Sequence, residues 1–77
     1  MARAELTSIE AWALQLVRRT RRHLRRAPEP REVCQHNGLK FPKEHVKLKA
    51  AVRRLMNKGH LAQWKRPRQA LRLRDPA

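Results

Sequence analysis

The side chains of this sequence that could do chemistry are mostly cations, and the chemistry they favour is anion binding. On a helix, with about 100° per residue, one face of the stretch 43–57 combines cations with small residues and carries no acid. A face this one-sided is typical of a recognition helix lying in a groove lined by phosphates. The predicted DNA-contacting residues of this face are Lys43, Val46, Lys47, Ala50, Arg53, Arg54 and Asn57.

Further cations lie on both sides of this stretch. Those predicted to contact DNA are Lys40, Lys65, Arg66 and Arg68, the last three around Pro67. Those predicted as secondary phosphate contacts are Arg18, Arg19, Arg21, Arg22, Arg25, Arg26 and Arg31. The cluster from Arg18 to Arg26 allows three interpretations: a solvated face that includes helix-dipole pairing, a second phosphate contact, or an RNA-binding arginine-rich helix.

Catalytic and metal-binding chemistry have little support in the sequence. Six acids, four His and one Cys form no nucleophile–base set at a recognisable spacing, so the chain is not expected to be an enzyme. Zinc ligands usually come in closely spaced pairs, which the single Cys and the scattered His do not form; these are Cys34, His36, His45 and His60. We therefore expect no metal and no cofactor, and a buried Cys34.

The composition favours a polyanionic partner. Twenty Lys and Arg against six Asp and Glu give the 77 residues a net charge of +14. Self-repulsion on this scale disfavours a compact chain, so the cations are expected to serve binding to nucleic acid rather than to a membrane. One cysteine and no long apolar run predict an intracellular protein, in the cytoplasm or nucleoid, or in host cytoplasm if the protein is viral.

Three helices must position these side chains. Thr7 and Glu10 form a capping box, which predicts a helix over about 7–26 with Ile9, Trp12 and other apolar residues inward. Two prolines then interrupt the chain, and a short helix is expected over about 30–37. After Leu39 and Phe41, both expected in the core, the recognition helix spans about 42–58. Its expected buried face consists of Leu48, Ala51, Val52 and Leu55.

Beyond Gly59 the hydrophobic period changes from helical to two. Segments 60–64 and 70–74 alternate apolar and polar residues, which predicts two strands joined at Pro67. The sequence thus predicts one mainly α domain over 1–77, a winged helix-turn-helix of three helices plus a hairpin wing over about 60–74.

Residues along most of the chain resemble the DNA-binding domain of LexA-type repressors and related winged-helix regulators. The resemblance rests on Leu6-Thr7, on the Pro28–Val33 segment, on the Val52–Leu61 junction and on Leu71-Arg72-Leu73. It implies a winged-helix fold, a major-groove recognition helix and a wing beside it.

Together these features predict a double-stranded DNA-binding protein, a small transcriptional regulator that could act as a monomer or a homodimer. Two alternatives remain open at this point. One is an RNA-binding protein of ribosomal or ribonucleoprotein type that uses the Arg18–Arg26 helix. The other is a protein–protein adaptor or inhibitor that grips an acidic surface.

Overall fold

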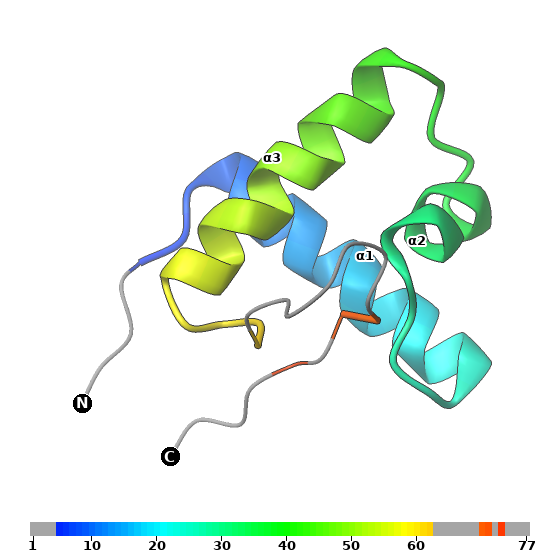
Figure 1. Cartoon of the computed structure of the whole chain (residues 1–77), viewed down its shortest axis with the longest axis horizontal. Coiled ribbons are helices and arrows are strands. Elements are labelled where there is room, and N and C mark those ends of the chain that lie inside the picture. Colours follow the sequence, from blue (N-terminus) through cyan, green and yellow to red (C-terminus); the bar gives the residue numbers. More distant parts are fainter. Residues whose placement is uncertain (1–4, 63–69, 72, 74–77) are drawn as a thin grey trace.

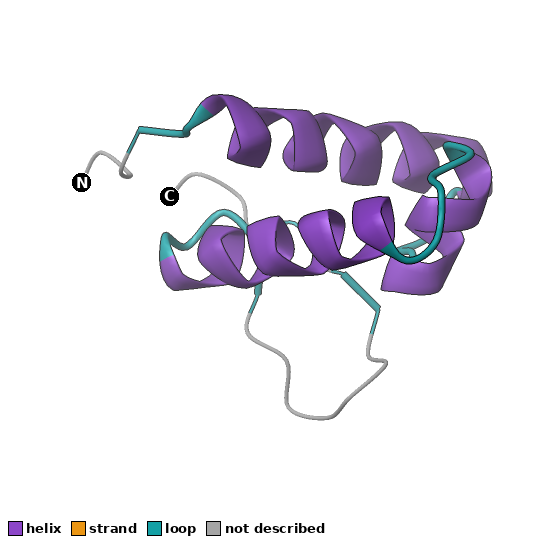
Figure 2. Ribbon diagram, turned by 90° about the horizontal axis from the view of Figure 1, so that it is seen from above, coloured by secondary structure: helices purple, strands orange, loops and turns teal. Residues whose placement is uncertain are grey.

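The part of the chain that the structure describes forms three helices arranged in two layers. The computed structural model describes residues 5–62, 70, 71 and 73. The helices are α1 (Ser8–Leu24), α2 (Pro30–His36) and α3 (Lys43–Asn57). In Figure 1, α3 crosses in front of α1, and α2 lies beside the later part of α1. The view turned by 90° separates α1 and α3 into opposite layers with α2 at one end (Figure 2).

Helix α1 begins at the predicted capping box. The Thr7 amide donates to Glu10 Oε1 at 3.0 Å, and the Glu10 amide donates to Thr7 Oγ1 at 3.3 Å. These two bonds satisfy amides that the first turn of a helix otherwise leaves without a partner. The helix ends at Leu24, slightly earlier than predicted, because Arg25 adopts the left-handed conformation at φ 59°.

Helix α2 begins at Pro30, as predicted, because proline fits the first helical position. After α2, Gly38 takes the left-handed conformation with φ +63°. Asn37 fixes this turn to both preceding helices. Its side-chain amide donates to Thr20 Oγ1 at 3.0 Å and to the Val33 carbonyl at 2.8 Å. The turn between α2 and α3 is therefore hydrogen-bonded to α1 as well as to α2.

The core lies where the three helices meet. All four residues predicted for the buried face of α3 are fully buried: Leu48, Ala51, Val52 and Leu55. They pack with Ala13 and Val17 of α1 and with Val33 and Cys34 of α2. The predicted helix stop at Gly59 is confirmed by its φ of +84°. At the same end of α3, Lys58 forms an ion pair with buried Glu10, which ties α3 to the first turn of α1.

The predicted winged helix-turn-helix, with its hairpin over 60–74, is wrong in its β part: the described residues form three helices and no strand. One isolated antiparallel bridge joins Leu61 and Leu73. Two backbone amides of this segment bond to the helical part of the chain and not to a partner strand. The Leu61 amide donates to the Leu55 carbonyl at 3.3 Å, and the Leu71 amide donates to the Pro28 carbonyl at 2.5 Å. The period-two pattern instead buries Leu61 and Leu71 against the helices.

Two apolar residues predicted to lie inside are on the surface. Phe41 is 80% exposed and Ile9 is 40% exposed. Leu14 is buried whereas Ile9 is exposed, so the apolar face of α1 is rotated slightly from the predicted one. Leu39 and Trp12 pack against the core as partly buried residues.

Candidate nucleic-acid interface

The outward face of α3 is exposed along its whole length. Every residue predicted for this face is exposed: Lys43, Val46, Lys47, Ala50, Arg53, Arg54 and Asn57. Lys40, in the turn before α3, is exposed as well. Val46 is 63% exposed, although an aliphatic side chain gains by burial. We call this set of α3 residues the α3 face.

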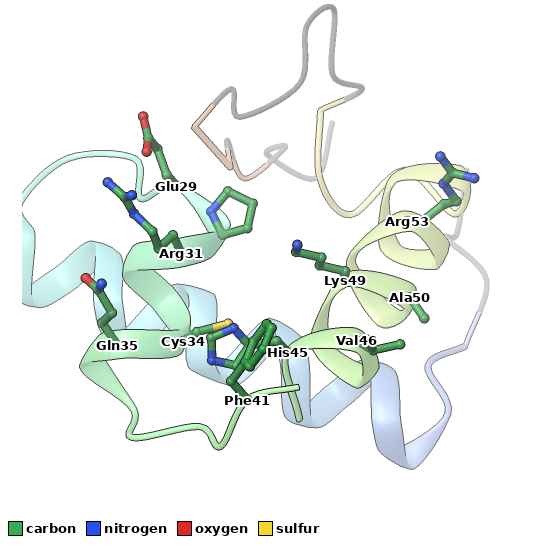
Figure 3. A pocket seen from close by; sticks show the side chains of 11 residues that line it. Glu29, Arg31, Cys34, Gln35, Phe41, His45, Val46, Lys49, Ala50 and Arg53 are labelled. Atoms are coloured by element: carbon green, nitrogen blue, oxygen red, sulfur yellow. The ribbon is translucent and has the colours of Figure 1, made fainter. Parts of the chain in front are cut away.

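A groove of about 1080 Å³ lies between α2 and the α3 face (Figure 3). Its apolar lining includes Pro30, Cys34 and Phe41, with Val46 and Ala50 from α3. Its cationic lining consists of Arg31, Lys49 and Arg53, and the remaining described lining residues are Glu29, Gln35 and His45. Lys49 extends from α3 toward α2 across the groove (Figure 3). The groove therefore joins cations from two helices around an apolar floor.

Lys49, Gln35, Phe41 and His45 were not among the predicted site residues. Lys49 is three residues from Val46 and four from Arg53, so a helical wheel drawn to include the α2 side would have found it. Phe41 was expected in the core. His45 holds it outside by an edge-to-face contact with 5.3 Å between ring centroids, and His45 Nε2 lies 3.2 Å from the Leu39 carbonyl oxygen.

Burial controls the one thiol in the groove lining. Cys34 is 1% exposed, and burial raises the pKa of its thiol, with Lys49 acting weakly in the opposite direction. A buried thiol with a raised pKa stays protonated and behaves as a small apolar residue. Cys34 therefore contributes to the groove floor as a core residue, as expected.

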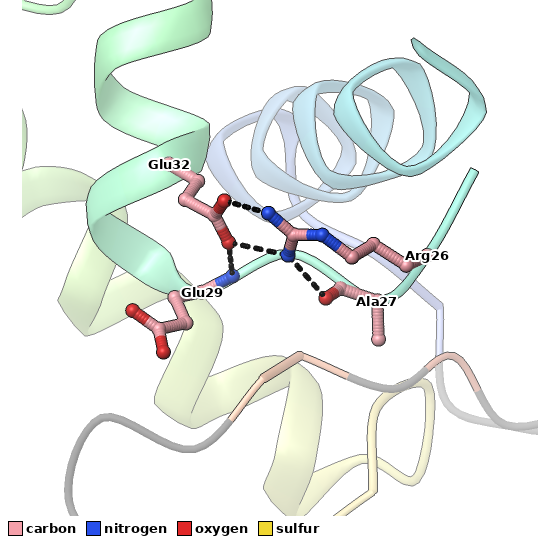
Figure 4. A network of polar contacts seen from close by, with 4 residues as sticks. All are labelled: Arg26, Ala27, Glu29 and Glu32. Carbon is pink, nitrogen blue, oxygen red and sulfur yellow. Dashed lines mark hydrogen bonds and ion pairs between the residues drawn. The ribbon is translucent and has the colours of Figure 1, made fainter. Parts of the chain in front are cut away.

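Three acids near the helices, Glu10, Glu32 and Glu44, are engaged within the fold. Glu32 accepts two hydrogen bonds from the Arg26 guanidinium (Figure 4) and one from the Glu29 amide at 2.8 Å. The Arg26 hydrogen bonds lower the pKa of Glu32 to about 2. Glu10 is 2% exposed, and its hydrogen bond from Lys58 lowers its pKa. Glu44 accepts a bond from the Lys40 amide at 2.9 Å. No acid therefore faces outward among the α3 face residues.

The opposite flank of α3 packs against α1. Lys47 Nζ lies 5.0 Å from the centroid of the Trp12 ring, a cation–π contact that orients the lysine. Arg54 lies two helical turns after Lys47 on the same side of α3 and pairs with no acid among the described residues. The cations of the α3 face thus form two rows, with Val46 and Ala50 between them.

The arginine cluster of α1 divides into two parts. Arg26 is committed to Glu32 and supports the connection between α1 and α2. The other five side chains are exposed and have no ion pair with a described acid: Arg18, Arg19, Arg21, Arg22 and Arg25. Next to them, the centroids of the His23 and His36 rings lie 4.5 Å apart at the junction of α1 and α2.

Some predicted residues cannot be placed on this surface. Lys65, Arg66 and Arg68 lie outside the described residues. Among the residues described, no group of three or more His, Cys, Asp or Glu is arranged to hold a metal ion. None of the described helices combines the length and apolar character needed to cross a membrane.

Comparison with protein-family models, with curated proteins and with solved structures found no match to this chain.

Proposed function

We propose that this protein binds double-stranded DNA through the α3 face, with α3 in the major groove and α2 braced across it as a helix-turn-helix. The observation that carries the proposal is the composition of that face, in which exposed cations flank Val46 and Ala50 without an acid. A helix with its side chains is about 10–12 Å wide, which matches a major groove about 12 Å wide.

The position of the cations favours binding over folding as their role. Lys43 is the first residue of α3, and Arg31 is the second residue of α2. The N-terminal end of a helix carries partial positive charge, so a cation there is unfavourable for the isolated protein. A phosphate beside these side chains reverses the sign of that interaction. Duplex phosphates would therefore supply the negative charge that these two cations lack in the isolated protein.

The outermost line of α3 and its two flanks are expected to make different contacts. Val46, Ala50, Arg53 and Asn57 lie along the outermost line of the helix, where they meet base edges. Arg can pair with guanine, Asn with adenine, and an aliphatic side chain can contact a thymine methyl. Lys47, Arg54 and Lys49 on the flanks, with Arg31 on α2, meet the two phosphate backbones. We infer that the protein acts inside cells as a small regulator of transcription.

An RNA duplex fits the α3 face less well. The major groove of A-form RNA is too deep and narrow for side chains on a helix to read. In addition, the described part of the surface offers few aromatic rings for stacking on unpaired bases, with Phe41 the most exposed. The arginines of α1 are the surface that an RNA partner would use, so an RNA preference would shift the function to that helix.

The test is fluorescence anisotropy at about 150 mM salt, close to physiological ionic strength. It compares a random-sequence DNA duplex with a structured RNA of equal phosphate number. We expect tighter binding to the duplex, with a log–log salt slope of about −4 to −7 for about five to eight phosphate contacts. Preference for the RNA would contradict the proposal. So would duplex binding no tighter than that of a polyarginine of equal charge.

A further inference from the structure

Exposed arginines in the second half of α1 and at its C-cap form a second cationic surface that the α3 site does not use. Arg18, Arg19, Arg21, Arg22 and Arg25 are all exposed, and no acid occurs between Glu10 and Glu29 in the sequence. We call these five residues the α1 face. Arg26 is excluded from it, because its guanidinium is paired with Glu32.

The fold gains little from the α1 face. A helix dipole favours cations only within the last turn, which covers Arg21 and Arg22 but leaves Arg18 and Arg19 a turn too early. Arg18 and Arg22 are four residues apart, and Arg19 and Arg22 are three apart, so like charges are neighbours and repel one another. A bound polyanion would remove this repulsion.

The α1 face and the α3 face look in opposite directions. Ala13 and Val17 of α1 and Leu48 and Ala51 of α3 are fully buried in one shared core. Each helix therefore turns its buried side toward the other, and the cations of the α3 face other than Lys47, which contacts Trp12, lie away from α1. Figure 2 shows α1 and α3 as two separate layers. A straight duplex lying on the α3 face cannot also lie on the α1 face.

From this arrangement we propose that the α1 face binds a second, separate DNA duplex, so that one protein molecule bridges two duplexes. The proposal rests on duplex binding by the α3 face. The α1 face holds the second duplex through its phosphates alone, because its exposed side chains are guanidinium groups and no small apolar residue is exposed between Arg18 and Arg22. This second contact is consequently independent of DNA sequence and weakened by salt.

The experiment is capture of a fluorescent duplex by protein bound to a second duplex on beads. Duplexes of about 20 base pairs are used, because this is far below the persistence length of about 150 base pairs and prevents wrapping around one molecule. Two variants with the same charge are compared, Arg18→Glu/Arg22→Glu and Arg53→Glu/Arg54→Glu. Each reversal removes two positive charges, so both variants carry +10 rather than +14.

We expect the wild-type protein to capture the second duplex. The α1 variant should keep its anisotropy affinity for one duplex within about threefold and lose at least about tenfold in capture. The α3 variant should lose single-duplex affinity by at least about tenfold. Circular dichroism checks that both variants fold, and Arg18→Gln/Arg22→Gln provides a neutral version that should show the same loss of capture.

The outcomes separate the two proposals. A wild-type protein that binds one duplex but captures no second one overturns bridging and leaves α3 binding intact. Capture that is unchanged in both α1 variants also overturns it, since the second site then lies elsewhere or arises from self-association. A wild-type protein with no duplex affinity at all overturns the proposed function and bridging with it.

Discussion

The outer surfaces of α1 and α3 are both cationic, yet they differ in what lies between the charges. On α3, Val46 and Ala50 separate the cations and leave room for close approach to another surface. On α1, arginines occupy four of the five positions from Arg18 to Arg22, and the fifth, Thr20, is buried. A surface of guanidinium groups alone can hold phosphates but has little with which to read bases. Under the proposed function, cations on both surfaces would contact phosphates, whereas the small apolar residues of α3 would let that surface contact bases.

The largest expected effect comes from breaking the core that the two surfaces share. Leu48→Ala removes a side chain with no exposed area and should lower the free energy of unfolding by about 2–5 kcal/mol. The free energy of unfolding of a domain of this size is small, so the variant should unfold and duplex binding by both faces should be lost together. Urea denaturation measures the change. Val46→Ala, on the exposed side of the same helix, is the control and should stay within about 0.5 kcal/mol. Equal stabilities of the two variants would contradict this account of the core.

Two matched substitutions test whether duplex binding depends on the α3 face or on net charge alone. Val46→Glu places a carboxylate at the centre of the α3 face, and Gln15→Glu places one on the exposed side of α1. Both add one negative charge to an exposed helical position. We expect Val46→Glu to reduce single-duplex affinity at least about tenfold and Gln15→Glu to reduce it less than about threefold. Anisotropy titrations at one salt concentration measure both. Similar losses in the two variants would mean that charge alone governs binding.

The pH dependence of unfolding at acid pH should distinguish Arg26, which pairs with Glu32, from the other arginines of α1. The folded-state pKa of Glu32 is lowered from 4.5 to about 2 by its bonds from Arg26. The stabilisation is therefore present above about pH 4.5 and is lost as the pH falls toward about 2. Glu32→Gln should reduce the pH dependence of the urea midpoint in this window. Part of the dependence should remain, because Lys58 also lowers the pKa of Glu10.

Arg18→Gln is the control for this measurement, since Arg18 pairs with no described acid. It should leave the pH dependence of the urea midpoint unchanged. If Glu32→Gln behaves like Arg18→Gln, the Arg26–Glu32 pair does not stabilise the fold. Arg26 would then belong with the exposed arginines of the α1 face.

The smallest predicted effect concerns base reading by the α3 face. Replacing thymine by uracil in a selected tight-binding duplex deletes only a methyl group. If Val46 contacts that methyl, the affinity should fall about two- to fivefold, the value of about one buried methyl group. Val46→Ala should bind the two duplexes more equally than the wild-type protein does. Equal affinity of the wild-type protein for both duplexes would remove Val46 from the reading residues.

The sequence predicted the helices better than the C-terminal segment. The helix starts depend on local chemistry that a sequence displays, such as the Thr7–Glu10 capping box and the proline at position 30. The hairpin prediction was wrong because alternation of apolar residues reports which side chains are buried, not where their amides bond. The amides of Leu61 and Leu71 bond to the end of α3 and to the connection before α2. Those partners are distant in sequence and leave no local pattern.

The candidate surface was predicted in part for a similar reason. The exposed positions of α3 followed from its period, because its buried face is regular from Leu48 to Leu55. The α2 side of the groove depends on how two helices pack, which placed Lys49 and Gln35 beside the floor. Phe41 was assigned to the core on hydrophobicity, whereas a contact with His45 holds it in the groove lining.

Duplex binding through α3 can be tested by mapping the backbone amide shifts of ¹⁵N-labelled protein as a duplex of about 20 base pairs is added. With the first equivalent of duplex, we predict the largest shift changes along α3, at Val46, Ala50 and Arg53. The amides of Arg18 and Arg22 should change only when a second equivalent is added. Largest changes at Arg18 and Arg22 with the first equivalent, and none along α3, would contradict the account.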